Sequence, residues 1–222
     1  MKKIILSTIF SILLCVPAFS IGINVGVSGT MGVFHATGTD TETGPTVVDT
    51  SSEDVTGVVG YTSVFIEKTL GDRITLGVDY VPDALESQTA SSTVDDLKGI
   101  EAANVTAKQI QKVQVDFKDL TTVYLAFNVT ESLYLKAGYV QVDIITNETL
   151  ATGSTYNNTD MSGETFGIGY NKSFDNGMFA RVEGSYTDFG SVSLTASNNT
   201  DNKITLGQLE GAAGKISIGK SF

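Results

Sequence analysis

The sequence has one cysteine, one histidine, three prolines and no tryptophan among its 222 residues. A single cysteine excludes an intramolecular disulfide and any metal site built from several cysteines. A single histidine excludes multi-histidine metal sites and allows histidine-dependent catalysis at only one place. Basic residues are scarce too: 14 Lys and Arg stand against 25 Asp and Glu, a formal net charge of −11. Electrostatics will not draw such an acidic chain to nucleic acid or to an anionic membrane surface.

Long apolar runs are lacking as well, apart from one near the N-terminus. Lys2 and Lys3 precede an apolar stretch of roughly 13 residues, which is followed by small residues up to Ser20. This order is typical of a secretory signal peptide, so we expect residues 1–20 to be cleaved, with an uncleaved anchor as the alternative. Cleavage would lower the basic count from 14 to 12 and remove Cys15, leaving a cysteine-free chain of net charge −13. Since no later stretch matches a spanning helix, any membrane role must use strands.

From residue 21 onward, apolar residues alternate with small or polar ones. Ile74, Leu76 and Val78, for example, share one face, and Thr75 and Gly77 share the other. A period of two predicts β-strands with one apolar face. Eight strands are expected, at about 22–37, 54–69, 73–84, 113–129, 133–146, 161–174, 178–196 and 203–222.

The predicted connections alternate between short and long. The short turns are at 70–72, 130–132 and 175–177, and the long polar loops are at 38–53, 85–112, 147–160 and 197–202. Unlike ends of this kind predict an all-β, eight-stranded antiparallel up-and-down transmembrane β-barrel over residues 21–222. A weak helical stripe in 94–112 favours a short helix in the longest loop. That stripe argues against a ten-stranded barrel, which would need two strands from 85–112.

Two finer features of strand pairing can also be predicted. The run Val64–Ile66 breaks the alternation, which indicates a β-bulge. Pairing Phe222 with Met178 centres the last hairpin on Thr200 and gives arms of about 20 residues, roughly twice the length that crosses a bilayer. The strands should therefore project beyond the membrane on the long-loop side.

The leading segment, the eight strands, the unlike ends and the terminal Phe222 together resemble small bacterial outer-membrane β-barrels: the transmembrane domain of outer membrane protein A, the opacity proteins and their relatives. The resemblance covers 21–222 and rests on pattern rather than on a catalytic motif. It implies the outer membrane of a Gram-negative cell, contact with lipid and lipopolysaccharide, and a C-terminal strand read by the barrel-assembly machinery. Phe222, Ile218 and Ile216 match that assembly signal, whereas Lys220 stands where an apolar residue is usual.

A secreted β-sandwich or lipocalin-like barrel would alternate in the same way. The many glycines on the small-and-polar face, the Tyr and Phe residues near strand ends and the terminal Phe favour the membrane barrel. Its polar face would then line an interior that side chains just fill. Four charged residues fall on that face: Asp79, Lys136, Arg181 and Glu183. Because lone buried charges are costly, we expect them to pair as a structural network or, alternatively, to line a polar path for small solutes.

Catalytic and metal sites find little support. His35 lies between Phe34 and Ala36 with no serine and carboxylate set nearby, so we expect no enzyme activity. The acidic groups within 40–54 and 95–101 supply oxygen ligands but match no defined calcium loop. We therefore expect no catalytic residue, no metal and no cofactor.

The sequence thus predicts an integral outer-membrane barrel with a structural or surface-interaction role through its extracellular loops. Its partners would be lipid, lipopolysaccharide, the assembly machinery and an extracellular ligand, and not nucleic acid. The alternative is a narrow porin-like channel, which requires a continuous wet lumen.

Overall fold

The computed structural model describes residues 22–43, 48–86, 90–95, 108–149, 154–198 and 200–222, so the expected signal peptide lies outside the described residues. The strands are β1 Ile23–Thr43, β2 Val48–Leu70, β3 Ile74–Tyr80, β4 Leu85–Glu86, β5 Ala90–Asp95, β6 Lys108–Asn128, β7 Leu133–Thr149, β8 Thr159–Ser173, β9 Met178–Asp188, β10 Val192–Thr195 and β11 Lys203–Ser221. In the part of the chain just listed, no helix is long and apolar enough to cross a membrane.

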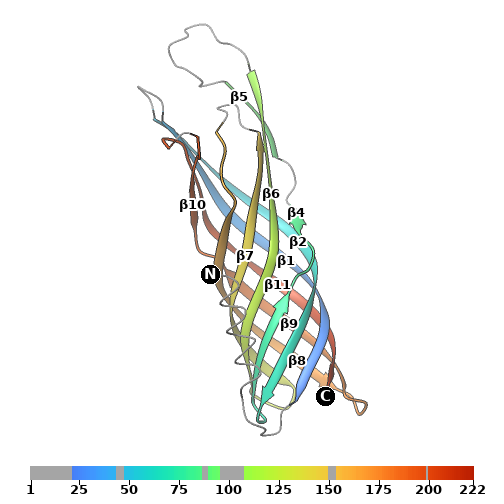
Figure 1. Ribbon diagram of the computed structural model, residues 1–222. Coiled ribbons are helices and arrows are strands. Elements are labelled where there is room, and N and C mark those ends of the chain that lie inside the picture. The colour runs from blue at the N-terminus through green and yellow to red at the C-terminus, as the bar shows by residue number, and fades with distance from the viewer. Residues whose placement is uncertain (1–21, 44–47, 87–89, 96–107, 150–153, 199) are drawn as a thin grey trace.

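Eight strands form a closed antiparallel ring in the order β1, β2, β3, β6, β7, β8, β9 and β11, and β11 returns to β1 (Figure 1). This confirms the predicted eight-stranded up-and-down barrel. The short strands β4 and β5 pair with β6, and β10 pairs with β11. These short strands pair along one side of a ring strand and are not members of the ring itself. The barrel is therefore not the ten-stranded alternative.

The three short turns lie at one end of the barrel, where the sequence predicted them. Gly71 and Gly177 have φ angles of 64° and 78°, in the left-handed region that glycine adopts most easily. Ile23 and Phe222 meet at the same end, where the N–H of Phe222 donates to the carbonyl of Ile23 at 2.9 Å. The first and last strands therefore close the ring.

At the opposite end, strand pairing continues farther than the sequence predicted. β1 and β2 stay paired up to Thr43 and Val48, so most of the expected 38–53 loop is a β-ribbon. The expected helix is wrong at both its ends, because β5 runs to Asp95 and β6 starts at Lys108. Residues 96–107 lie outside the described ranges.

Register agrees with prediction only in part. Met178 pairs with Lys220 and not with Phe222, a shift of two residues that leaves every side chain on its predicted face. The bulge expected in β2 is not present, since β1 and β2 pair without a register shift. Shifts occur instead beside Asp119 in β6 and beside Gln208 in β11, which are the two non-glycine residues with positive φ in the described part of the chain.

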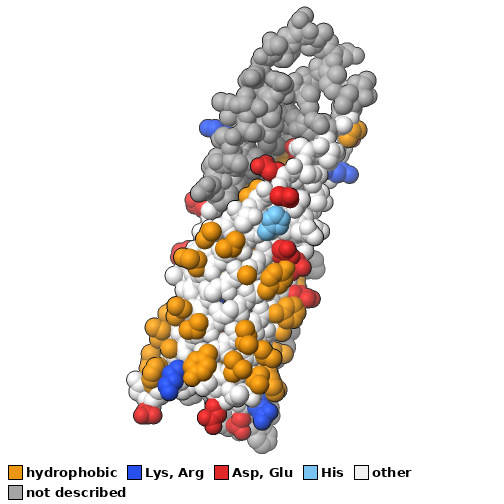
Figure 2. Space-filling model, turned by 180° about the vertical axis from the view of Figure 1, so that it is seen from behind, with side chains coloured by type: hydrophobic (Ala, Val, Ile, Leu, Met, Phe, Trp, Pro, Cys, Tyr) orange, Lys and Arg blue, Asp and Glu red, His pale blue; other side chains and the backbone are white. Residues whose placement is uncertain are grey.

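Large apolar side chains cover the outside of the barrel near its short-turn end. Val27 is 59% exposed, Phe166 57% and Ile216 63%, and these side chains come from strands all around the ring. Figure 2 shows them gathered over the lower part of one face, with acidic and polar side chains farther up. A band of outward apolar residues is the surface that a bilayer-spanning barrel presents to lipid.

Inside this band, large aromatic rings lie on glycines of the adjacent strand. A Cβ built on Gly169 would be 2.3 Å from the Tyr134 ring, and one on Gly77 would be 2.4 Å from the Tyr124 ring. Each ring residue pairs directly with its glycine, as do Phe65 with Gly26 and Phe179 with Gly219. Glycine thus leaves room for an aromatic side chain in a narrow interior.

Candidate functional site

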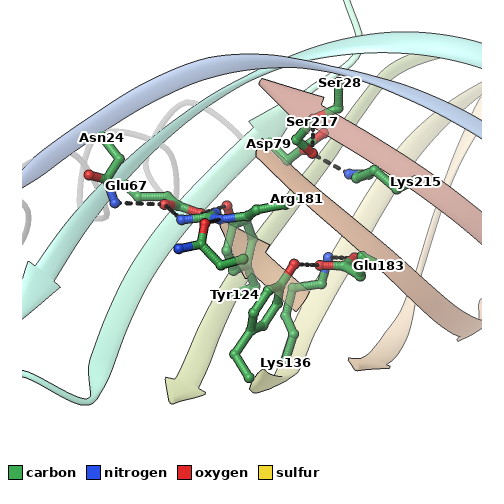
Figure 3. A network of polar contacts seen from close by, with 12 residues as sticks. Asn24, Ser28, Glu67, Asp79, Tyr124, Lys136, Arg181, Glu183, Lys215 and Ser217 are labelled. Carbon is green, nitrogen blue, oxygen red and sulfur yellow. Dashed lines mark hydrogen bonds and ion pairs between the residues drawn. The ribbon is translucent and has the colours of Figure 1, made fainter. Parts of the chain in front are cut away.

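The interior of the barrel at membrane level holds three ion pairs, here called the lumen network (Figure 3). It contains Glu67 with Arg181, Glu183 with Lys136, and Asp79 with Lys215. The six charges sum to zero. All six side chains are buried or nearly so, and pairing offsets the large cost of removing charges from water.

Glu67 and Arg181 make the most extensive contact of the lumen network. The two terminal guanidinium nitrogens of Arg181, Nη1 and Nη2, donate to the carboxylate of Glu67, with Nη2 to Oε2 at 2.8 Å. Tyr124 Oη donates to Glu67 Oε1 at 2.7 Å, and Asn24 Nδ2 to Oε2 at 3.0 Å. The Arg181 guanidinium also lies 4.4 Å from the ring centre of Phe179. Glu67, which is fully buried, is therefore fully hydrogen-bonded.

The other two pairs tie different strands together. Lys136 of β7 contacts Glu183 of β9, and Tyr134 Oη donates to the second oxygen of Glu183 at 2.8 Å. Lys215 Nζ of β11 donates to Asp79 Oδ2 of β3 at 2.8 Å. The lumen network thus links strands that are not neighbours in the ring, across the barrel interior.

The structure places all four charged residues of the sequence prediction, Asp79, Lys136, Arg181 and Glu183, in this network. Sequence reasoning missed two partners. Lys215 lies on the same face of β11 as Ser217 and Gly219. Following the alternation two residues further toward the N-terminus would have identified it as an interior residue. Glu67 was missed because three apolar residues in a row, Val64 to Ile66, break the alternation of β2. Phe65 points inward and its two neighbours point outward, so the sequence did not show which face of β2 lines the interior.

A polar cavity of about 250 Å³ lies beside the lumen network. Its lining runs from Asp79 and Lys215 to Asn128, Glu131 and Ser173 at the short-turn end. The cavity therefore connects the network with one mouth of the barrel.

Farther toward the other end, the interior changes from polar to apolar. A cluster of buried side chains, here called the apolar plug, fills it: Val140, Val142, Ile144, Met161, Phe189 and Leu209. Phe34, Phe117 and Leu206 pack against this cluster. None of the six plug residues lines the polar cavity.

At the same level, the outward face of the strands changes from apolar to polar. On β7, the outward-pointing Tyr139 is 52% exposed, and Gln141 and Asp143 follow it on that face before Ile145. Val142 and Ile144, which alternate with them and point inward, are only 2% and 3% exposed. Apolar inside and polar outside is the pattern of a β-barrel in water, so the strands beyond this level form a projecting end outside the lipid band.

The remaining predicted residues lie on the outer surface. Ile216 and Ile218 point outward from β11, and Phe222 is 72% exposed, with Lys220 Nζ 5.4 Å from its ring centre. His35 contacts the hydroxyl of Thr56 at 3.2 Å. Among the described residues, no group of three or more His, Cys, Asp or Glu side chains could hold a metal ion, and part of the 95–101 acidic group lies outside them.

No family model and no curated protein matches the chain. Among solved structures, the outer membrane protein OprG from Pseudomonas aeruginosa matches with a TM-score of 0.55 and 10% identity, over 90% of this chain and 96% of OprG. Neisserial surface protein A matches with a TM-score of 0.37 and 10% identity, over 86% and 97% of the two chains. Ail of Yersinia pestis, in complex with the heparin analogue sucrose octasulfate, gives 0.36 and 10%, over 86% and 98%. The closed ring of eight strands and the match to OprG show that the chain has the fold of the small eight-stranded barrels of bacterial outer membranes.

Proposed function

We propose that this barrel is anchored in the outer membrane and contacts extracellular molecules through its projecting end. The observation that carries the proposal is the length of the strands. β1, β2 and β6 have 21, 23 and 21 residues, about twice the 9–11 that cross a bilayer. Half of each strand is thus available outside the lipid.

The projecting end is suited to this role because it is a folded surface. The apolar plug gives the projecting end a core of its own. Side chains of paired strands also hydrogen-bond to each other there: Thr37 Oγ1 donates to Asp54 Oδ1 at 2.7 Å. A surface that is already ordered binds without a large loss of conformational entropy.

The same interior argues against the alternative, a porin-like channel. A conducting path must remain wet from mouth to mouth, but the apolar plug occupies the interior beyond the polar cavity. The six plug residues are all apolar and offer water and ions no polar side chain. The proposal also includes no enzymatic step, because His35 contacts only a threonine hydroxyl among the hydrogen bonds described for it.

The proposal can be tested on whole cells that express the full chain or a trimmed variant. In the trimmed variant, Asn-Gly replaces residues 38–53 and closes β1 and β2 at the Thr37–Asp54 pair. Retention of the cells on coats of extracellular-matrix proteins and polysaccharides is measured. Equal surface labelling and an intact heat-dependent gel shift serve as controls for insertion. We expect trimming to reduce retention on at least one coat, and equal retention on all of them would contradict the proposal.

A further inference from the structure

The projecting end contains a strand edge that pairs with no other strand among the described residues. β2 pairs with β1 from Val48 to Lys68, but with β3 only from Val64 to Leu70. After Tyr80 the chain turns to β6, where the N–H of Val81 donates to the carbonyl of Leu120 at 2.9 Å. β4 and β5 then follow β6 as well. Within the described ranges, residues 48–63 of β2 therefore have a strand on one side only.

This open edge is accessible. Every residue from 50 to 58 is exposed, and the side chains of Val55 and Val58 are 56% and 71% exposed. Because residues of both parities are exposed there, both faces of the ribbon as well as its edge meet solvent.

The direction of the backbone groups follows from one hydrogen bond and the register. The N–H of Thr69 donates to the carbonyl of Gly22, which lies on the β1 side. In an antiparallel ladder the residues alternate in the side to which their N–H and C=O point, and β1 and β2 pair without a shift. Odd-numbered residues of β2 therefore face β1. The even-numbered residues offer their N–H and C=O groups to the open side: Thr50, Ser52, Asp54, Thr56, Val58, Gly60 and Thr62.

The charge of this region selects the partner. From Val33 to Val64 the sequence has five acidic residues and no lysine or arginine. A second copy would bring the same five negative charges against them, and like charges on adjacent strands are unfavourable. The negative charges of the ribbon would instead attract a basic strand as it approaches, and its lysine or arginine side chains would pair with these charges once it is bound.

We propose that the open edge of β2 binds an extended segment rich in lysine or arginine by β-strand addition. Main-chain hydrogen bonds to the even-numbered residues provide the affinity, and the acidic ribbon provides the preference for basic partners. The inference rests on the proposed surface-interaction function and names the chemistry of the partner for that same end of the barrel.

The experiment uses the full-length barrel in detergent micelles and measures fluorescence anisotropy of labelled peptides. The probe is a peptide of Thr-Lys repeats. A Thr-Glu repeat tests the charge preference. A Thr-Lys repeat methylated at every backbone nitrogen keeps its charge but has no N–H to donate. We expect saturable binding of the first peptide only, weakening as salt is added.

A matched pair of variants tests the edge itself. Val58→Pro removes an N–H from the open side without touching the β1 ladder, and Val58→Thr keeps that N–H. We expect Val58→Pro to weaken binding by roughly tenfold or more, and Val58→Thr to leave it unchanged. An unaltered heat-dependent gel shift shows that both variants are folded.

Three outcomes would overturn the inference: no binding of the Thr-Lys peptide, equal binding of the fully methylated peptide, or equal binding by Val58→Pro. Dimerisation of the barrel that is lost in Val58→Pro, without peptide binding, would assign the edge to self-pairing and overturn it too. The cell-retention assay is separate from these measurements. Retention that depends on residues 38–53 but survives Val58→Pro would uphold the proposed function and reject strand addition.

Discussion

At the scale of single residues, the ion pairs of the lumen network are the most consequential feature. Removing one partner from a buried pair leaves the other charge without compensation. We expect Arg181→Met to destabilise the barrel by about 3–5 kcal/mol, because the fully buried Glu67 then loses its cation. The free energy of unfolding, from urea titration of the refolded barrel, is the measurement.

The double variant Glu67→Gln with Arg181→Met is the control for that experiment. It removes both charges, so we expect it to recover most of the loss caused by Arg181→Met alone. If the double variant were as unstable as the single one, the loss would come from packing and not from charge.

The contact between glycine and aromatic ring gives a second prediction at this scale. Gly169→Ala places a methyl group against the Tyr134 ring, whose hydroxyl donates to Glu183. We expect a loss of roughly 1–3 kcal/mol in urea unfolding, since overpacking displaces the ring. Gly184→Ala is the matched control, because a Cβ there meets nothing within 4 Å. Similar losses in both variants would refute the steric explanation.

The sequence predicts which residues enter the interior wherever one face meets lipid. Period two places Lys136, Arg181 and Glu183 correctly because Leu135 and Val182 beside them must point outward. The pairing itself is not encoded locally: Glu67 and Arg181 are 114 positions apart. Only the closed ring brings them together, so no local pattern could have named the partners.

At the scale of the strand, the open edge of β2 can be tested by stability alone. Val58→Pro removes a donor that has no partner in the described structure, so we expect the free energy of unfolding to stay within about 0.5 kcal/mol of the unaltered barrel. Val59→Pro removes a donor to β1, and we expect a loss of about 1–3 kcal/mol. Thermal unfolding of both variants is the measurement. Equal losses would mean that the edge of β2 is paired.

The sequence predicted the strand ends poorly at the projecting end of the barrel, and the reason is physical. From residue 50 to residue 58, both faces of the β1–β2 ribbon meet water, so no alternation of apolar and polar residues is required there. The polar run from 38 to 53 has the composition of a loop, yet its threonines suit a strand. Two of the three short turns were found because Gly71 and Gly177 meet a strict backbone requirement.

At the scale of the whole molecule, the apolar plug and the lumen network together predict an electrically silent barrel. In a planar bilayer we expect no unitary current from refolded protein whose folding is shown by the heat-dependent gel shift. Stable current steps that change when Lys136 is replaced by methionine would contradict this and favour the channel.

The C-terminal strand leads to a prediction about assembly. We expect Phe222→Ala to reduce insertion into the outer membrane in cells while leaving refolding in micelles nearly unchanged, because the ring of Phe222 is 72% exposed and supports little of the packed interior. Surface labelling in cells and the gel shift in vitro measure the two steps. Equal loss in both assays would assign Phe222 to stability rather than to assembly.

The seam between β1 and β11 also has a consequence for kinetics. Ser28 and Ser217, which hydrogen-bond inside the barrel at 2.9 Å, are 189 positions apart. Until that seam closes, the inward face of the sheet, with its six charges, would be open to hydrocarbon. Partly inserted sheets are therefore high in energy, and such non-local closure is intrinsically slow. The pairing of β11 with β1 is thus the step that commits the whole barrel to the membrane.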